Sequence, residues 1–232
     1  MLRHIIWDVD GTLFDTYPAI NAAFRAAAQD QGADAEPDWI EDLTLVSLDH
    51  CIEAMAARFG LVAEALEEAF RVRYAEHAIV DSPPFPGVIE VVRHVLSIGG
   101  TNVIVTHRRR ASTEALLAAN DMEDLFAGLL TATEGYPRKP DPAMFLAAIS
   151  GFGLDPAETI AVGDRALDVA AGRAAGVRTC LFGSPGDAAG ADLVVADFAG
   201  LLRYLVAANT AGGEAGDGAG RTSAQHASGR RG

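Results

Sequence analysis

Two aspartates separated by one residue follow the first apolar run of the chain. Residues 5–7 are apolar and lead directly into Asp8-Val9-Asp10-Gly11-Thr12. Side chains at positions i and i+2 of a strand point the same way, so we expect Asp8 and Asp10 to share one site while Val9 faces the core. Two ionised carboxylates repel each other at close range unless a cation or a shared proton is present. The segment therefore predicts a metal-dependent phosphate site at the carboxyl end of a strand.

A second candidate site residue is Thr106, which ends the apolar run 103–105. A hydroxyl and a free backbone amide at a strand end can donate hydrogen bonds to a phosphate oxygen. Taken alone, Thr106 is better explained as a residue at a helix N-terminus, where Ser and Thr are preferred. His107, Arg108, Arg109 and Arg110 follow it. Such a basic run is usually a solvated face, although one member could contact an anionic substrate.

The third candidate is Lys139, which stands between Pro137 and Pro140. The prolines limit the freedom of the backbone, and Asp141-Pro142 indicates that a helix begins just afterwards. A lysine held there is well placed to neutralise a phosphoryl group. A surface lysine in a turn explains the position equally well when it is taken alone.

The fourth candidate is Gly163-Asp164 together with Asp168, which follow the apolar run 160–162. We expect Asp164 to end a buried strand and Asp168 to lie one helical turn further on the same side. Hard oxygen ligands of this kind suit Mg²⁺, which uses one or two carboxylates and a substrate phosphate. The alternative is an aspartate that caps a helix, with a second aspartate nearby by chance.

The elements that position these residues are short apolar runs that alternate with helical patterns. The runs are 5–7, 102–105, 128–130, 159–162, 178–182 and 192–195. Several lack the alternation of a half-exposed strand, which indicates burial on both faces of a parallel sheet. We therefore predict an α/β fold with a doubly wound parallel sheet, which binds ligands at the carboxyl ends of its strands. All four candidates fall at such ends, and together they are a much stronger signal than any one of them.

The connection after the first strand is much longer than a crossover needs. It contains three stretches with helical spacing of apolar residues, so we predict a helical module at 16–82 that covers the site as a lid. The sheet-bearing core is then 1–15 and 83–206. Beyond it, 207–232 is predicted to be a disordered Gly/Ala-rich tail, because it offers too little apolar surface to offset the entropy of ordering.

The composition of the chain limits the classes of molecule that it can be expected to bind. The chain has 232 residues and a formal net charge of −14, which argues against nucleic acid or an anionic membrane as a partner. Cys51 and Cys180 are expected to be reduced, buried fillers. The N-terminal apolar run is too short for a signal peptide. These features together predict a cytoplasmic protein, and they leave its oligomeric state open.

The ordered set Asp8 to Thr12, Thr106, Lys139 and Gly163-Asp164 to Asp168 resembles the haloacid dehalogenase superfamily over residues 1 to about 206. The inserted helices resemble its helical-cap subgroup, which includes phosphoglycolate phosphatase-like enzymes. The resemblance implies a Rossmann-like core in which Asp8 is the nucleophile and Asp10 the general acid and base. It also implies that Thr106 and Lys139 hold the phosphoryl group. Mg²⁺ would be bound by Asp8, the backbone carbonyl of Asp10, Asp164 and Asp168.

The expected reaction is hydrolysis of a small phosphorylated metabolite through an aspartyl-phosphate. We count His107 with Thr106 and Lys139 among the phosphate-binding candidates. Many relatives carry Asn or Gly at the position of His107, and this departure makes the substrate harder to predict. Two alternatives stay open. One is a phosphosugar mutase of the β-phosphoglucomutase type, and the other is a receiver-like signalling domain that only stores a phosphoryl group.

Overall fold

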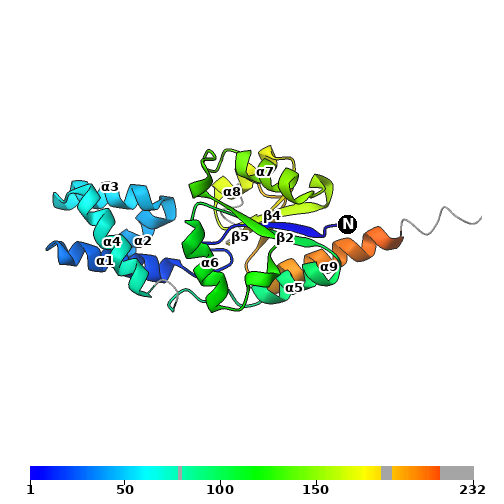
Figure 1. Cartoon of the computed structure of the whole chain (residues 1–232), viewed down its shortest axis with the longest axis horizontal. Coiled ribbons are helices and arrows are strands. Elements are labelled where there is room, and N and C mark those ends of the chain that lie inside the picture. The colour runs from blue at the N-terminus through cyan, green and yellow to red at the C-terminus, as the bar shows by residue number, and fades with distance from the viewer. Residues whose placement is uncertain (78–79, 184–189, 215–232) are drawn as a thin grey trace, which may run out of the picture.

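A six-stranded parallel sheet lies at the centre of the computed structural model, which describes residues 1–77, 80–183 and 190–214 (Figure 1). The strand order is β3-β2-β1-β4-β5-β6, which confirms the predicted doubly wound parallel sheet. The strands are β1 His4–Trp7, β2 Thr101–Thr106, β3 Gly128–Thr131, β4 Thr159–Gly163, β5 Arg178–Phe182 and β6 Leu193–Val195. Each lies within a residue or two of an apolar run in the sequence.

Helices cover both faces of the sheet, which is why its strands are apolar on both sides. Ile5 and Trp7 pack into the cluster formed with α5 Val88–Ser97, α6 Arg110–Ala119 and α9 Phe198–Glu214. Ile6 points to the opposite face and packs with α7 Ala143–Phe152 and α8 Ala166–Ala174. Short 3₁₀ helices span Glu123–Leu125, Ala132–Glu134 and Pro156–Glu158. The two layers hold β1 and β4 rigidly side by side, so the residues that follow them have fixed positions.

Four helices with a hydrophobic cluster of their own lie at one end of the molecule (Figure 1). They are α1 Tyr17–Asp30, α2 Pro37–Val46, α3 Leu48–Phe59 and α4 Ala63–His77, and they occupy the range in which the sequence predicts the inserted helical module. The Phe24 and Phe70 rings stack with their centroids 3.9 Å apart at its centre. The two connections to the sheet lie side by side, because the Asp15 amide donates to the Pro83 carbonyl at 2.9 Å.

The C-terminal prediction needs a correction. The sequence predicts disorder from residue 207, yet α9 continues to Glu214. The Asn209 side chain anchors this end of the helix to the start of β1: its Oδ1 accepts from the Leu2 amide at 2.7 Å, and its Nδ2 donates to the Leu2 carbonyl at 2.9 Å. Apolar composition alone misses such a polar anchor. Residues 215–232 lie outside the described part of the chain.

Membrane-spanning helices are not found among the described residues, since none of those helices combines sufficient length with sufficient apolar character.

Candidate active site

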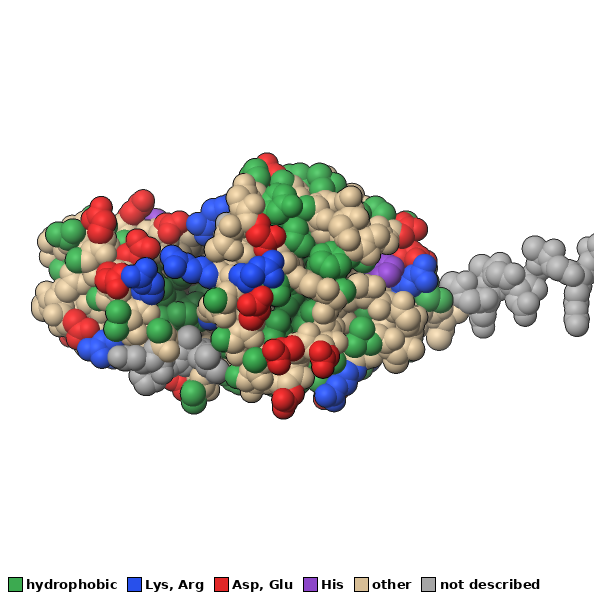
Figure 2. Space-filling view, viewed as in Figure 1, with side chains coloured by type: hydrophobic (Ala, Val, Ile, Leu, Met, Phe, Trp, Pro, Cys, Tyr) green, Lys and Arg blue, Asp and Glu red, His purple; other side chains and the backbone are tan. Residues whose placement is uncertain are grey.

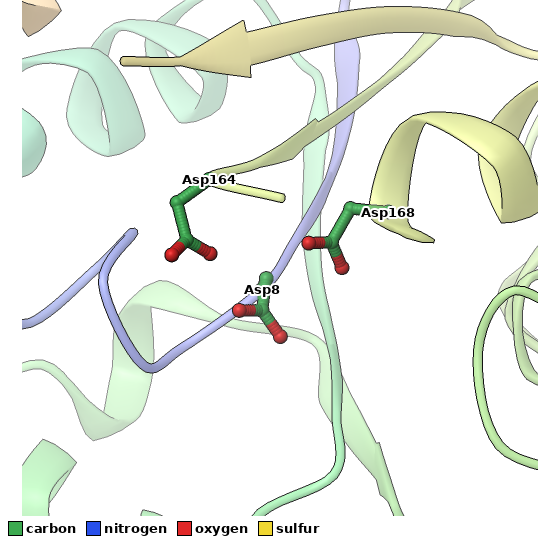
Figure 3. A group of neighbouring side chains, drawn as sticks. All are labelled: Asp8, Asp164 and Asp168. Atoms are coloured by element: carbon green, nitrogen blue, oxygen red, sulfur yellow. The ribbon is translucent and has the colours of Figure 1, made fainter. Parts of the chain in front are cut away.

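Three carboxylates converge at the carboxyl end of the sheet (Figure 3). Asp8 follows β1, Asp164 follows the adjacent strand β4, and Asp168 lies in the first turn of α8. One carboxylate oxygen from each lies within 4.8 Å of those of the other two. The parallel pairing of β1 with β4 brings together residues that are far apart in the sequence.

Local structure explains how Asp168 reaches this group. Helix α8 begins at Ala166, and the Asp168 carboxylate folds back to accept a hydrogen bond from the Arg165 amide at 3.3 Å. This is the carboxylate half of a capping box, which satisfies a free amide at the helix N-terminus. Asp168 therefore stabilises the helix start while its other oxygen faces the site.

Two glycines make room for these carboxylates. A Cβ atom on Gly11 would lie 2.4 Å from Asp164 Oδ2, and one on Gly163 would lie 2.3 Å from the Asp168 Cβ. Gly11 also has a φ of +74°, in the left-handed region that glycine adopts most readily. Any larger residue at either position would displace one of the acids.

Lys139 is buried between two of the three acids. Its Nζ donates to Asp8 Oδ1 at 2.6 Å and to Asp168 Oδ1 at 2.7 Å, and its side chain is 0% exposed. Lys139 is also the only lysine in the sequence, where arginine supplies every other fixed cation. A compact ammonium fits between two carboxylates where a planar guanidinium would not.

Negative charge exceeds positive charge among these side chains, and burial together with this excess shifts their pKa values. Burial raises the pKa of Asp164 to about 7, and the charges of Asp8 and Asp168 act in the same direction. Burial also raises the pKa of Asp168, against the effect of the adjacent ammonium. Burial disfavours the charged form of Lys139, but Asp168 and Asp8 outweigh it and raise the pKa of its amine. Three acids thus face one ammonium, that of Lys139, and one guanidinium, that of Arg165, whose Nε lies 4.0 Å from Asp164 Oδ1.

The residues present fit a divalent cation. Asp8 Oδ2 is buried and has no hydrogen-bond partner among the described residues, although a buried carboxylate oxygen normally has one. Hard carboxylate oxygens at this spacing suit Mg²⁺, whose charge would offset the excess of acid. Asp8, Asp164 and Asp168 are the residues that would hold it.

Two hydroxyl groups donate hydrogen bonds to Asp164, in addition to its ion pair with Arg165. The Thr12 hydroxyl donates to Asp164 Oδ1 at 3.3 Å, and the Tyr17 hydroxyl donates to Oδ2 at 3.0 Å. Burial raises the pKa of Tyr17, and the Asp164 charge adds to the effect, so the phenol stays a donor. Tyr17 is the first residue of α1, and it links the inserted helices directly to the carboxylate group.

Asp10 is not one of the three carboxylates whose oxygens lie within 4.8 Å of one another. Its Oδ1 instead accepts from Arg108 Nη1 at 2.8 Å. The same nitrogen donates to the Tyr74 hydroxyl at 2.7 Å, and Tyr74 comes from α4. The chain turns after Asp8, so the alternation of a strand no longer applies; Val9 packs into the core as predicted.

Thr106 and His107 lie at the end of β2, next to β1. Thr106 is buried, and its Oγ1 accepts from the Arg108 amide at 3.0 Å, which leaves the hydroxyl hydrogen free to donate. His107 Nε2 accepts from the Lys139 amide at 2.8 Å, so this nitrogen is already paired with the backbone. Burial lowers the pKa of His107 to about 4, and the charges of Lys139 and Arg138 lower it further. A neutral His107 holds the loop that carries Lys139.

A cavity of about 760 Å³ runs along α1 and α2 from the edge of the site. Its lining includes Asp15, Tyr17, Asn21 and Arg25, so the residue that contacts Asp164 also borders open space. The molecular surface is hollowed between the inserted helices and the sheet-bearing part, with basic side chains on both sides of the hollow (Figure 2).

Sequence reasoning missed the role of Arg108 and Tyr74. Arg108 belongs to a basic run that is usually solvent-exposed, and Arg109 is indeed exposed, whereas Arg108 is buried. Its place two residues after Thr106 at a strand end is the signal that could have identified it. Among the polar side chains of the inserted helices, Tyr17 reaches the carboxylates. Arg58, Arg71 and Arg73 instead form ion pairs within the helical module, and the contact found for His50 is a backbone bond to Ser47.

Comparisons with a family model, with related sequences and with solved structures all lead to the same family of hydrolases. A family model described as haloacid dehalogenase-like hydrolase matches residues 2–176. The chain is 31% identical to N-acetylmuramic acid 6-phosphate phosphatase from Pseudomonas aeruginosa, over 77% of this chain and 80% of that protein. It is 30% identical to phosphoglycolate phosphatase from Caulobacter vibrioides, over 84% and 86%. The crystal structure of a predicted phosphoglycolate phosphatase from Haemophilus somnus has the same fold, with a TM-score of 0.79 and 22% identity over 88% of this chain and 98% of that one.

Proposed function

This chain belongs to the haloacid dehalogenase-like hydrolase family, and from that premise we propose that it is a Mg²⁺-dependent phosphatase that acts through an aspartyl-phosphate on Asp8. The family and the phosphatases among its relatives make it a phosphoric monoester hydrolase. The relatives act on phosphoglycolate and on a sugar phosphate, so small esters of this kind are the proposed substrates. The observation that carries the proposal is the free, buried Asp8 Oδ2 beside Lys139, Asp164 and Asp168.

Asp8 is the proposed nucleophile. Lys139 holds one of its oxygens, and the other is left to attack phosphorus in line. The new Asp8 oxygen–phosphorus bond forms as the bond to the ester oxygen breaks, and Asp10 gives its proton to the departing alkoxide. In the second step Asp10 takes a proton from water, whose oxygen bonds to phosphorus. The bond to Asp8 then breaks and inorganic phosphate leaves.

Positioning and charge contribute most of the rate enhancement in this scheme. Uncatalysed hydrolysis of phosphate monoesters is so slow that enzymes accelerate it by up to ~10²¹, whereas an acid–base group contributes about 10²–10⁴. Lys139 supplies fixed positive charge, and the Thr106 hydroxyl is available to a phosphoryl oxygen. Mg²⁺ held by Asp8, Asp164 and Asp168, with help from the Asp10 carbonyl, would neutralise charge on the transferring group.

The inserted helices are proposed to act as a lid at 16–82 on a core formed by 1–15 and 83–206. The cavity along α1 would take the leaving group, and the Tyr17–Asp164 hydrogen bond connects its position to the site. We also propose that the enzyme acts in the cytoplasm, where the free, buried Cys51 and Cys180 would stay reduced.

The test is phosphate release from a panel of small phosphate monoesters, with Mg²⁺ and with a chelator. We expect activity that requires Mg²⁺, and that Asp8→Asn abolishes while the circular dichroism spectrum is unchanged. Asp124→Asn is the matched control, because Asp124 is exposed and distant in the sequence from every site residue. Full activity in Asp8→Asn would overturn the proposal. Conversion of a hexose 1-phosphate without phosphate release would identify a mutase instead.

A further inference from the structure

Arg108 is a buried cation with part of its hydrogen-bonding capacity unused. Its side chain is 6% exposed, and Nη1 is its one bonded side-chain nitrogen within the described residues, with Asp10 and Tyr74 as partners. Nε and Nη2 are buried and have no partner there. A guanidinium so placed normally has all its donors satisfied. The unused donors indicate that something else completes this group.

The geometry of the unused donors specifies the ligand. Nε–H and one Nη2–H lie on the same edge of a guanidinium and point in parallel, which is the fork that binds both oxygens of a carboxylate or a similar oxyanion. Lys139, an ammonium without such a fork, lies among the three carboxylates, whereas Arg108 lies beside Asp10. The two cations are thus suited to two different anionic groups.

The position of Arg108 limits where the second anion can be. Asp10 Oδ1 is 2.8 Å from Arg108 Nη1, and Asp10 is the residue proposed to protonate the ester oxygen of the leaving group. Because Asp10 and Arg108 are in direct contact, an anion bound on the free edge of that guanidinium would belong to the part of the substrate nearest the ester oxygen. A leaving group with a distant charge would not reach it.

From these contacts we infer that Arg108 is a specificity-determining residue that binds a carboxylate next to the ester oxygen of the substrate. The inference rests on the proposed function and narrows it to phosphate esters of short hydroxy acids. Tyr74 connects this recognition to the inserted helices: its hydroxyl bonds Arg108, and the guanidinium carbon is 5.2 Å from the centroid of its ring. Nε and Nη2 are buried in this structure, so binding of the ligand requires movement of the side chains packed on Arg108, of which Tyr74 on α4 is one.

The experiment compares phosphoglycolate with phosphoglycolamide, its neutral amide, and measures the ratio of the two kcat/KM values. We expect the wild-type ratio to favour the acid by roughly 10- to 100-fold, the range for hydrogen bonds to a charged group. Arg108→Met should bring the ratio close to one whatever happens to the separate rates, and Arg108→Lys should leave it between these values. Arg109→Met, an exposed neighbour, is the control and should keep the wild-type ratio.

Equal losses on both substrates in Arg108→Met, with the ratio unchanged, would overturn the inference and leave Arg108 as a positioning residue for Asp10. A wild-type ratio near one would also overturn it. If no ester is hydrolysed, including p-nitrophenyl phosphate, the proposed function fails, and calorimetric binding of the two compounds to the protein and to Arg108→Lys decides the inference separately. Preferential binding of the acid, weakened in the variant, would support it; equal binding of the two would refute it.

Discussion

Replacement of Lys139 by methionine should destabilise the fold as well as abolish activity. The ammonium lies 2.6 Å from Asp8 and 2.7 Å from Asp168, and the side chains of the three residues are 0%, 3% and 3% exposed. Its removal leaves two buried carboxylates without their counter-ion. Breaking a buried ion pair in this way costs about 3–5 kcal/mol, a large part of the 5–15 kcal/mol that holds a typical domain folded.

Urea unfolding at neutral pH, followed by circular dichroism, measures this loss. Lys139→Met combined with Asp168→Asn should be more stable than Lys139→Met alone, because the second change removes one of the stranded charges. Lys139→Arg keeps the charge but overfills the space, so we expect a smaller loss of about 1–3 kcal/mol. Arg109→Met, which removes an exposed cation, should change stability by less than about 0.5 kcal/mol. A loss in Lys139→Met as small as that of this control would refute the reasoning.

Three further predictions follow from the site. Gly11→Ala and Gly32→Ala impose similar backbone strain, at φ values of +74° and +79°, but only the first places a Cβ against Asp164 and Tyr17. Gly32→Ala should lose about 1–2 kcal/mol of stability, and Gly11→Ala should lose about 1–3 kcal/mol more through this overpacking. Only Gly11→Ala should lose more than about tenfold in kcat/KM. At the proposed site Mg²⁺ would bind the ionised form of Asp164, whose pKa is raised to about 7, so affinity measured by calorimetry should fall about tenfold per pH unit below that value and level off above it; an affinity independent of pH would contradict the assignment. The pKa of His107 is lowered from 6.5 to about 4 in the folded protein, so the unfolded chain binds a proton at this residue more readily. The contribution of neutral His107 to the free energy of unfolding is therefore complete above pH 6.5 and is lost as the pH falls towards 4. Discounted for partial exposure, this amounts to about 1–2 kcal/mol, and His107→Asn should flatten that part of the unfolding profile.

The fold was largely predictable because its signals are local. Uninterrupted apolar runs such as 159–162 indicated buried parallel strands, and the rule that ligands bind at the carboxyl ends of such strands placed the candidate residues at one edge. Asp8, Asp164, Asp168 and Lys139 lie together there. The positions of these residues depend on the order and length of the strands, which can be inferred from the pattern of apolar runs in the sequence.

The contacts that could not be predicted depend on where individual side chains point. Asp10 turns to Arg108 because the strand ends before it, and His107 bonds the backbone of Lys139 across 32 positions of sequence. Arg108 and Arg109 are chemically identical in the sequence, and contacts with Asp10 and Tyr74 distinguish the buried one from the exposed one. The end of α9 was missed for the same reason, since Asn209 anchors it through two hydrogen bonds to Leu2.

The stereochemical course at phosphorus tests the covalent step on Asp8 most directly. Each in-line displacement inverts the configuration of phosphorus, so a reaction with an aspartyl-phosphate inverts it twice. Hydrolysis of an isotopically chiral phosphate monoester by the wild-type enzyme should therefore give inorganic phosphate with retained configuration. Inversion would show that water attacks the substrate directly, and Asp8 would then not be the nucleophile.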